Sequence, residues 1–167
     1  TTKTFIESEI ETMRYFEARL WDVNSSYDHR RWIYVPYDQL NAGPFSLLSG
    51  DPKGLGIVLI ESVEKGSRRP YHKQKLALVL ANQRQFALEQ ARRGVAIHYV
   101  SAPSYSEGLT QAVAKLGTLE CMIPAERELR LELQPLVDDG SLTMHENRLW
   151  LTTCLLYTSD AADEVLG

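Results

Sequence analysis

The stretch "GIVLIES", Gly56–Ser62, decides the fold. Between the glycine and Glu61 it places four branched aliphatic residues in a row, with no polar residue among them. An unbroken apolar run of this length is typical of a strand that is buried on both faces. Strands of that kind lie in parallel sheets with helices packed on both sides, so we expect an α/β domain built around this strand.

The segments on either side of Gly56–Ser62 alternate between strand-like and helix-like patterns. Apolar, β-prone runs predict further strands at 32–35, 95–100, 119–124 and 141–146. Helical spacing predicts helices at 4–21, 71–93, 104–116 and 125–137, and a loop is expected at 41–53. Strands that alternate with helices need crossover connections and therefore pair in parallel. The sequence thus predicts a doubly wound, five-stranded parallel α/β domain at 31–153, Rossmann-like or flavodoxin-like, after a helical extension at 1–30.

The helix predicted at 71–93 carries apolar residues on two opposite sides. Leu76 and Val79 share one side, whereas Leu78 and Leu88 lie on the other. A helix that is apolar on two sides requires two packing neighbours. The sheet is expected to be one of them, and a lost part of a longer protein could be the other.

The composition is that of an ordinary globular protein, with 44% hydrophobic and 24% charged residues among 167. Its formal net charge of −4 argues against a domain that binds nucleic acid on its own by neutralising phosphates. No apolar run approaches the roughly 20 residues of a membrane span, so no membrane partner is expected. The two cysteines are far apart, which argues against a disulfide framework or a zinc site and favours a reducing, cytoplasmic location.

Polar side chains follow the strands of the predicted sheet. Tyr37, Asp38 and Gln39 come soon after the strand at 32–35, Glu61 ends the strand in "GIVLIES", and Glu126 follows the strand at 119–124. Ligands of open parallel sheets bind beyond the carboxyl ends of the strands, near the point where the strand order reverses. A phenol, carboxylates and an amide that converge there could hold the heteroatoms of a planar heterocycle.

Each of these residues also has a purely structural interpretation. Asp38 and Gln39 could cap a turn after the preceding proline, and Glu61 could be a solvated strand end. His98, within an apolar strand, fits a satisfied core or edge histidine better than a base or a ligand. Cys121 fits a small buried hydrophobic residue.

Several motifs are missing from the sequence. It contains no GxGxxG after the first strand, no GxxxxGK[ST], no GxSxG and no HExxH. A nucleotide-dependent enzyme, which would cradle phosphates with glycine patterns, is therefore the least supported function.

A basic cluster, "EKGSRRPYHKQK" at 64–75, leads into the helix predicted at 71–93. Its cations are Lys65, Arg68, Arg69, His72 when protonated, Lys73 and Lys75. Helix amino termini attract anions, and nearby cations strengthen that attraction. The cluster could therefore hold a ribityl or phosphate group or contact an acidic partner, and the alternative is a solvated loop.

The two ends of the chain suggest a piece of a longer protein. There is no initiator methionine, and the acidic residues near the amino end do not resemble a signal peptide. "CLLYTSDAADE", Cys154–Glu164, resembles the in-frame translation of a DNA sequencing adapter. We therefore expect 154–167 to be non-native and the gene to be truncated near Thr153, the alternative being a frayed natural end.

Four segments together resemble a known family. They are "YVPYDQL", "GIVLIES", "RRPYHKQKLALVLANQRQFALEQARRGVAIHYV" and "PAERELR", which occur in this order. They resemble the amino-terminal domain of photolyase-related proteins, the bacterial cryptochrome/photolyase branch that carries an iron–sulfur cluster. The resemblance covers most of 31–153, including "RLWLTT", which is similar to the family's entry into its interdomain linker. Residues 1–30 resemble a helical extension of some members more loosely.

The resemblance implies a flavoprotein that repairs ultraviolet-damaged DNA, typically (6-4) photoproducts, or senses blue light. Its α/β domain would bind a small antenna chromophore, a ribityl lumazine, and pass excitation to FAD. A larger helical domain, beyond this chain, would bind FAD, a 4Fe–4S cluster and damaged DNA. The parent would be a photolyase-related lyase, and this piece alone would be inactive.

The same resemblance implies which residues line the antenna pocket. They are Tyr37, Asp38, Gln39, Leu40, Glu61, His72 and Lys73. The family has glycine where this chain has Tyr37, so a phenol would narrow the pocket or stack on the chromophore. The competing hypothesis is a stand-alone, flavodoxin-like binding or signalling module without light chemistry.

Overall fold

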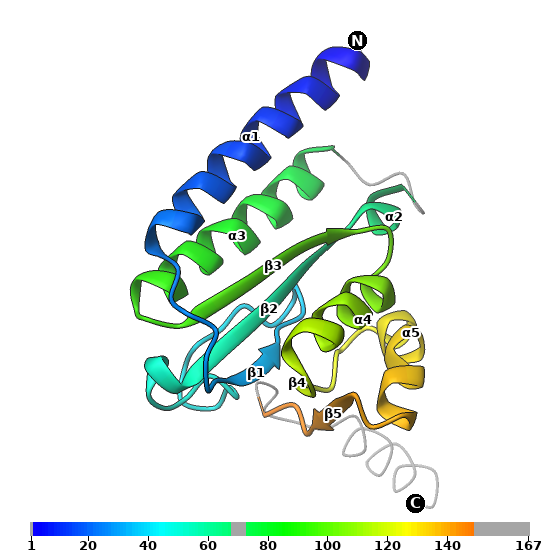
Figure 1. The fold of residues 1–167 in the computed structure, drawn as a ribbon. Coiled ribbons are helices and arrows are strands. Elements are labelled where there is room, and N and C mark those ends of the chain that lie inside the picture. The colour runs from blue at the N-terminus through cyan, green and yellow to red at the C-terminus, as the bar shows by residue number, and fades with distance from the viewer. Residues whose placement is uncertain (1, 68–72, 149–167) are drawn as a thin grey trace, which may run out of the picture.

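The computed structural model describes residues 2–67 and 73–148, and the side chains of 11–65 and 74–148. The predicted non-native tail at 154–167 lies outside these ranges. Figure 1 shows the arrangement of the elements. Along the chain they are α1 Thr2–Val23, β1 Arg31–Tyr34, η1 Pro52–Gly54, β2 Leu55–Ser62, α2 Val63–Ser67, α3 Lys73–Arg92, β3 Ala96–Ala102, α4 Tyr105–Leu116, β4 Leu119–Met122, α5 Arg127–Asp138 and β5 Leu142–His145.

The five strands form one parallel sheet in the order β3-β2-β1-β4-β5. The predicted doubly wound α/β fold is confirmed, and of the two predicted variants the strand order is the Rossmann one. The order reverses between β1 and β4, so the switch point lies where the chain leaves these two strands. Figure 1 shows α1 and α3 on one side of the sheet and α4 and α5 on the other.

The strand β2 is buried on both faces, as its unbroken apolar run predicted. Ile57 and Leu59 belong to a core with α1 and α3, and Val58 and Ile60 belong to a second core with α4 and α5. All four side chains are at most 2% exposed. The unbroken apolar run therefore reflects two helical layers, each of which needs its own row of side chains.

Within the part of the chain that the structure describes, helices cover one face of β4 and β5. Leu119, Cys121 and Leu142 are buried in the core of α4 and α5, whereas Glu120 and Thr143 alternate with them. This alternation is typical of strands with one solvated face.

The amino end of the sheet is fastened by Arg30. Its guanidinium group donates hydrogen bonds to four main-chain carbonyl oxygens, those of Ser26, Pro52, Leu55 and Gly94. These carbonyls belong to the loop before β1, to η1, to β2 and to the turn before β3. A single charged side chain thus ties together segments that are distant in sequence.

Two short elements were not predicted. The loop expected at 41–53 ends in η1, where Asp51 accepts a hydrogen bond from the Lys53 main-chain N–H at 3.1 Å and a proline opens the turn. The five-residue helix α2 lies in the predicted basic loop. Both elements are too short to leave an amphipathic pattern in the sequence.

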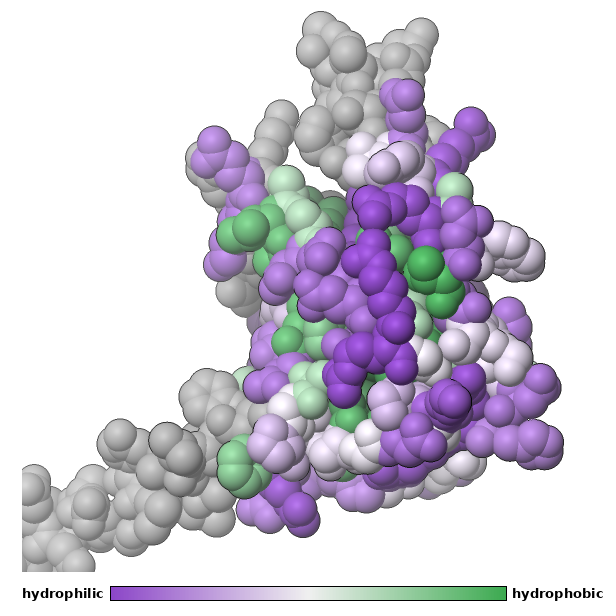
Figure 2. All heavy atoms as spheres, turned by 90° about the vertical axis from the view of Figure 1, so that its left-hand side faces the viewer, coloured by the Kyte–Doolittle hydropathy of each residue, from purple (hydrophilic) through white to green (hydrophobic). Residues whose placement is uncertain are grey.

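The helix α1 packs on α3 through Phe16 and Leu20, which are buried in the same core. The side of the molecule on the left in Figure 1 is covered mostly by hydrophilic side chains, with apolar ones in separate spots (Figure 2). None of the helices within 2–67 and 73–148 has the length and apolarity that a membrane crossing needs.

Candidate functional site

The candidate site lies at the switch point, beyond the carboxyl ends of β1 and β4. Tyr37, in the loop after β1, donates a hydrogen bond to Glu126 Oε2 at 2.8 Å. Lys65 of α2 forms an ion pair with the other carboxylate oxygen of Glu126. Glu126 precedes α5, so one carboxylate joins the segments that follow β1, β2 and β4. The sequence predicted that Tyr37 and Glu126 meet at this edge, and the structure brings them together.

A second tyrosine completes an aromatic surface beside this ion pair. The rings of Tyr37 and Tyr105, the first residue of α4, are stacked with centroids 6.4 Å apart and planes at 21°. The Lys65 ammonium group lies 5.7 Å from the centroid of the Tyr37 ring, within the range of a cation–π interaction.

These side chains border a hollow of about 130 Å³. It is lined by Tyr37, Lys65, Lys75, Leu76, Val79 and Tyr105. The lining combines two aromatic rings, two aliphatic side chains of α3 and two ammonium groups. Such a lining suits a flat, largely apolar molecule that carries polar oxygen atoms.

Charges at the site are balanced. Burial, followed by the hydrogen bond to Glu126, raises the pKa of Tyr37 far above neutral pH, so this phenol stays protonated and donates. Asp38 is exposed as a residue, yet partial burial of its carboxyl group raises its pKa, and the nearby Glu126 adds to that effect. The carboxyl groups of Glu126 and Asp38 thus lie near the Lys65 ammonium group, and Lys75 adds a second lysine to the lining. This arrangement favours a ligand without a large charge of its own.

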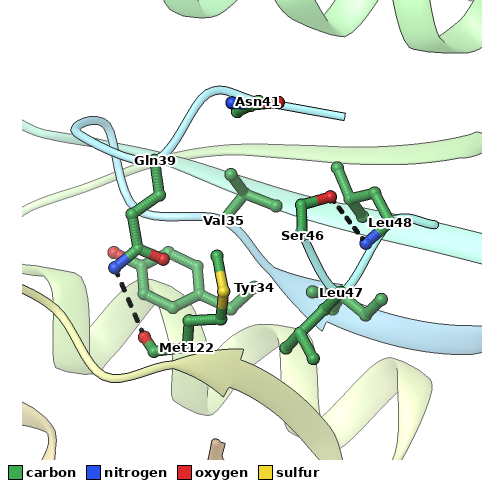
Figure 3. Close-up of a pocket in the computed structure, with 9 residues that line it drawn as sticks. Tyr34, Val35, Gln39, Asn41, Ser46, Leu47, Leu48 and Met122 are labelled. Carbon is green, nitrogen blue, oxygen red and sulfur yellow. Dashed lines mark hydrogen bonds between the residues drawn. The ribbon is translucent and has the colours of Figure 1, made fainter. Parts of the chain in front are cut away.

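Gln39 lies nearby, and its side chain is hydrogen-bonded to the main chain at the end of β4. Its side chain is 4% exposed, and Nε2 donates to the Ile123 carbonyl oxygen at 3.1 Å, with the Met122 carbonyl at 3.5 Å. Figure 3 shows this amide reaching from the loop after β1 to β4. The small hollow that Gln39 borders is about 10 Å³, no larger than one water molecule. Gln39 closes the crevice at the switch point, and Leu40 packs against the core of α1 and α3.

Glu61 lies on the opposite face of the sheet from Tyr37. Its carboxylate receives two hydrogen bonds from Arg84 of α3, at 2.7 and 3.0 Å, and one from the Tyr99 hydroxyl. Glu61 follows Ile57 and Leu59 at strand spacing and so points toward α3, whereas Tyr37 packs against the core of α4 and α5. The structure does not bring Glu61 to the hollow beside Tyr37.

Two predicted pocket residues lie at the edge of what is described. His72 is outside the described residues, and Lys73 begins α3 with its side chain outside them. Lys65 and Lys75, which line the hollow, were visible in the sequence as members of the basic cluster. Tyr105 was missed, although its place shortly after β3 could have identified it.

A larger hollow of about 480 Å³ lies at the amino edge of the sheet. Arg31 donates two hydrogen bonds to Glu120, at 2.6 and 2.7 Å, and His145 Nε2 lies 2.6 Å from the same carboxylate. The hydrogen bonds from Arg31 hold the pKa of Glu120 below its usual value, and the contact with His145 lowers it further. These groups satisfy one another, and the amino edge is not where doubly wound sheets bind ligands.

The structural interpretation of Cys121 is confirmed, and His98 is half-buried with its ring edge-on against Tyr27. Burial, with a smaller effect of Lys115, lowers the pKa of His98 to about 4, so the ring is neutral at physiological pH. Burial raises the pKa of the Cys121 thiol to about 12, and the residue is fully buried in a core. The described side chains contain no group of three or more His, Cys, Asp or Glu that could hold a metal ion.

A family model described as "Deoxyribodipyrimidine photo-lyase-related protein" matches residues 33–161. The matched range contains the hollow and all of the sheet except the first positions of β1. It also includes 154–161, a part of the predicted non-native tail, whose origin stays a prediction. No curated protein matches the chain.

Proposed function

Because the chain belongs to the deoxyribodipyrimidine photolyase-related protein family, we propose that its α/β domain binds an antenna chromophore in the hollow between Tyr37 and Tyr105. The chromophore is a flat heterocycle with a polyol chain, a ribityl lumazine. The native protein would use the captured light for DNA repair, typically of (6-4) photoproducts, or for blue-light sensing. FAD, a 4Fe–4S cluster and the contact with damaged DNA belong to a further helical domain in this proposal.

The observation that carries the proposal is the composition and place of the hollow. Two nearly parallel tyrosine rings offer faces on which a heterocycle can stack. Leu76 and Val79 exclude water from one side of it. The ammonium groups of Lys65 and Lys75 can donate to carbonyl or hydroxyl oxygens, and Glu126 can accept from a ribityl hydroxyl group.

The residues of this chain would bind and orient the chromophore, whereas the electronic chemistry is supplied by the chromophore and the flavin. Catalysis requires the domain that holds FAD, so we expect this chain alone to repair no DNA.

Lys65→Met is expected to weaken the binding of a ribityl lumazine about 10-fold, or about 1.4 kcal/mol. The substitution removes a charged donor from the hollow and leaves Glu126 without that cation. The measurement is a titration of the 167-residue chain with the lumazine, followed by the change in its fluorescence.

The matched control is Lys53→Met, because Lys53 is an exposed lysine of η1 that does not line the hollow. It should bind as the unmodified chain does. The proposal fails if the unmodified chain does not bind the lumazine, or if both lysine variants change the affinity equally.

A further inference from the structure

The Tyr34 hydroxyl group is an unpartnered polar atom at the end of β1. The residue is 1% exposed, and its hydroxyl group has no hydrogen-bond partner. Among the buried side-chain polar atoms of the described residues, only Gln83 Nε2 shares this condition. A buried hydroxyl group without a partner destabilises the folded state, because it has lost its hydrogen bonds to water. A buried group of this kind needs an explanation, such as a role in binding or catalysis or a bound water molecule.

Tyr34 lines the small hollow that Gln39 borders, close to the candidate site. It belongs to the same buried core as Tyr105, and Tyr37 packs against that core. Burial raises the pKa of Tyr34 well above its usual value, and the electrostatic effects of Tyr105, Cys121, Asp38 and Glu132 raise it further. The hydroxyl group is therefore protonated at neutral pH and available as a donor, next to groups that border the hollow.

The hollow is small, so a ligand of this kind has to displace part of its wall. At about 130 Å³ it is smaller than the roughly 300–1,000 Å³ of sites that enclose a drug-sized ligand. Tyr37 is half-buried, and its hydroxyl group donates a hydrogen bond to Glu126. An incoming ligand can replace that bond, so Tyr37 is the part of the wall that can yield.

We infer that Tyr34 is a ligand-binding residue of this site. Its hydroxyl group donates a hydrogen bond to a carbonyl oxygen or ring nitrogen of the heterocycle once the heterocycle has displaced the Tyr37 hydroxyl group from Glu126 and stacks on the Tyr37 and Tyr105 rings. The inference rests on the proposed function and extends it to a residue that does not line the hollow in the free protein. It identifies the ligand as a heterocycle with an acceptor at its edge, inserted edge-first toward β1.

The test is Tyr34→Phe, which removes the hydroxyl group and keeps the ring. The variant is expected to raise the melting temperature of the free chain by about 2–5 °C, because an unsatisfied buried group is removed. It is also expected to weaken the binding of a ribityl lumazine about 5- to 10-fold, because the ligand loses a donor. If the hydroxyl group had only a structural role, its removal would not both raise the melting temperature and weaken the binding of the lumazine.

The matched control is Tyr27→Phe. The Tyr27 hydroxyl group donates to the Ile97 carbonyl oxygen at 2.8 Å, away from the hollow. Its removal should lower the melting temperature and leave the affinity unchanged.

Two outcomes overturn the inference while the proposed function stands. A lower melting temperature of Tyr34→Phe would show that the hydroxyl group is hydrogen-bonded in the free protein, for example to an internal water molecule. An unchanged affinity would show that the ligand does not reach it. If the unmodified chain does not bind the lumazine at all, the proposed function fails first and the inference falls with it.

Discussion

Arg84→Met is expected to lower the free energy of unfolding by about 3–5 kcal/mol. The Arg84 and Glu61 side chains are only 12% and 10% exposed, and they form two hydrogen bonds between α3 and β2. Methionine keeps most of the aliphatic packing but leaves the Glu61 carboxylate buried, with the Tyr99 hydroxyl group as its remaining side-chain donor among the described residues. Urea unfolding of the two proteins, followed by circular dichroism, measures the difference.

Arg31→Met is the matched control. Arg31 makes the same type of two-pronged contact with Glu120, but these side chains are 44% and 27% exposed. Water can solvate the remaining carboxylate, so the loss should stay below about 1 kcal/mol. Equal losses for the two variants would contradict the claim that burial makes the Arg84 pair important.

Gly56→Ala is expected to destabilise the fold by about 2–3 kcal/mol through overpacking. Gly56 lies opposite Trp32 in the pairing of β1 with β2. A Cβ atom at this position would lie 2.4 Å from Trp32 Cε3, and real Cβ atoms do not approach so closely. The indole ring is 5% exposed and packed edge-on against Tyr27, so a shift of the ring disrupts this packing. Thermal and urea unfolding of the variant measure the effect.

Gly54→Ala is the control for this substitution. Gly54 lies two residues away in η1, and a Cβ atom there would meet no atom within 4 Å. Its stability should change by less than about 0.5 kcal/mol. A similar loss at both glycines would point to a general effect of replacing glycine rather than to contact with Trp32.

The sheet and its helices could be predicted because their patterns follow from burial. The apolar run in β2 reflects two cores, and the position of Gly94 at φ 95° after α3 fits the predicted helix end. The prediction that the second apolar side of α3 has a packing neighbour is met only in part. Leu88 is buried in the core, but Leu78 remains 70% exposed, so only part of that side has a neighbour within the described chain.

The candidate site could be predicted only in part, for a physical reason that concerns strand faces. Tyr37 and Glu126 meet because parallel strands end at the same edge. Glu61 also lies at that edge, near the carboxyl end of β2. Side chains alternate between the two faces of a strand, so a residue at this edge can point to either side of the sheet. Because β2 is apolar on both faces, its sequence does not reveal toward which helical layer Glu61 points. The structure shows that Glu61 points toward α3, where Arg84 binds its carboxylate.

The remaining site residues lie where local patterns carry little information. Lys65 reaches Glu126 from α2, a helix of five residues with no periodicity of its own. Tyr105 begins α4, and its stacking on Tyr37 depends on how two distant segments are packed. Such contacts are set by the tertiary structure and not by neighbours in the sequence.

A crystal structure of the 167-residue chain with a bound ribityl lumazine tests the central claim most directly. The account predicts that the heterocycle stacks at the switch point on the rings of Tyr37 and Tyr105, within hydrogen-bond distance of Lys65. A lumazine found instead in the amino-edge hollow beside Arg31 and Glu120, or no bound lumazine at saturating concentration, would contradict it.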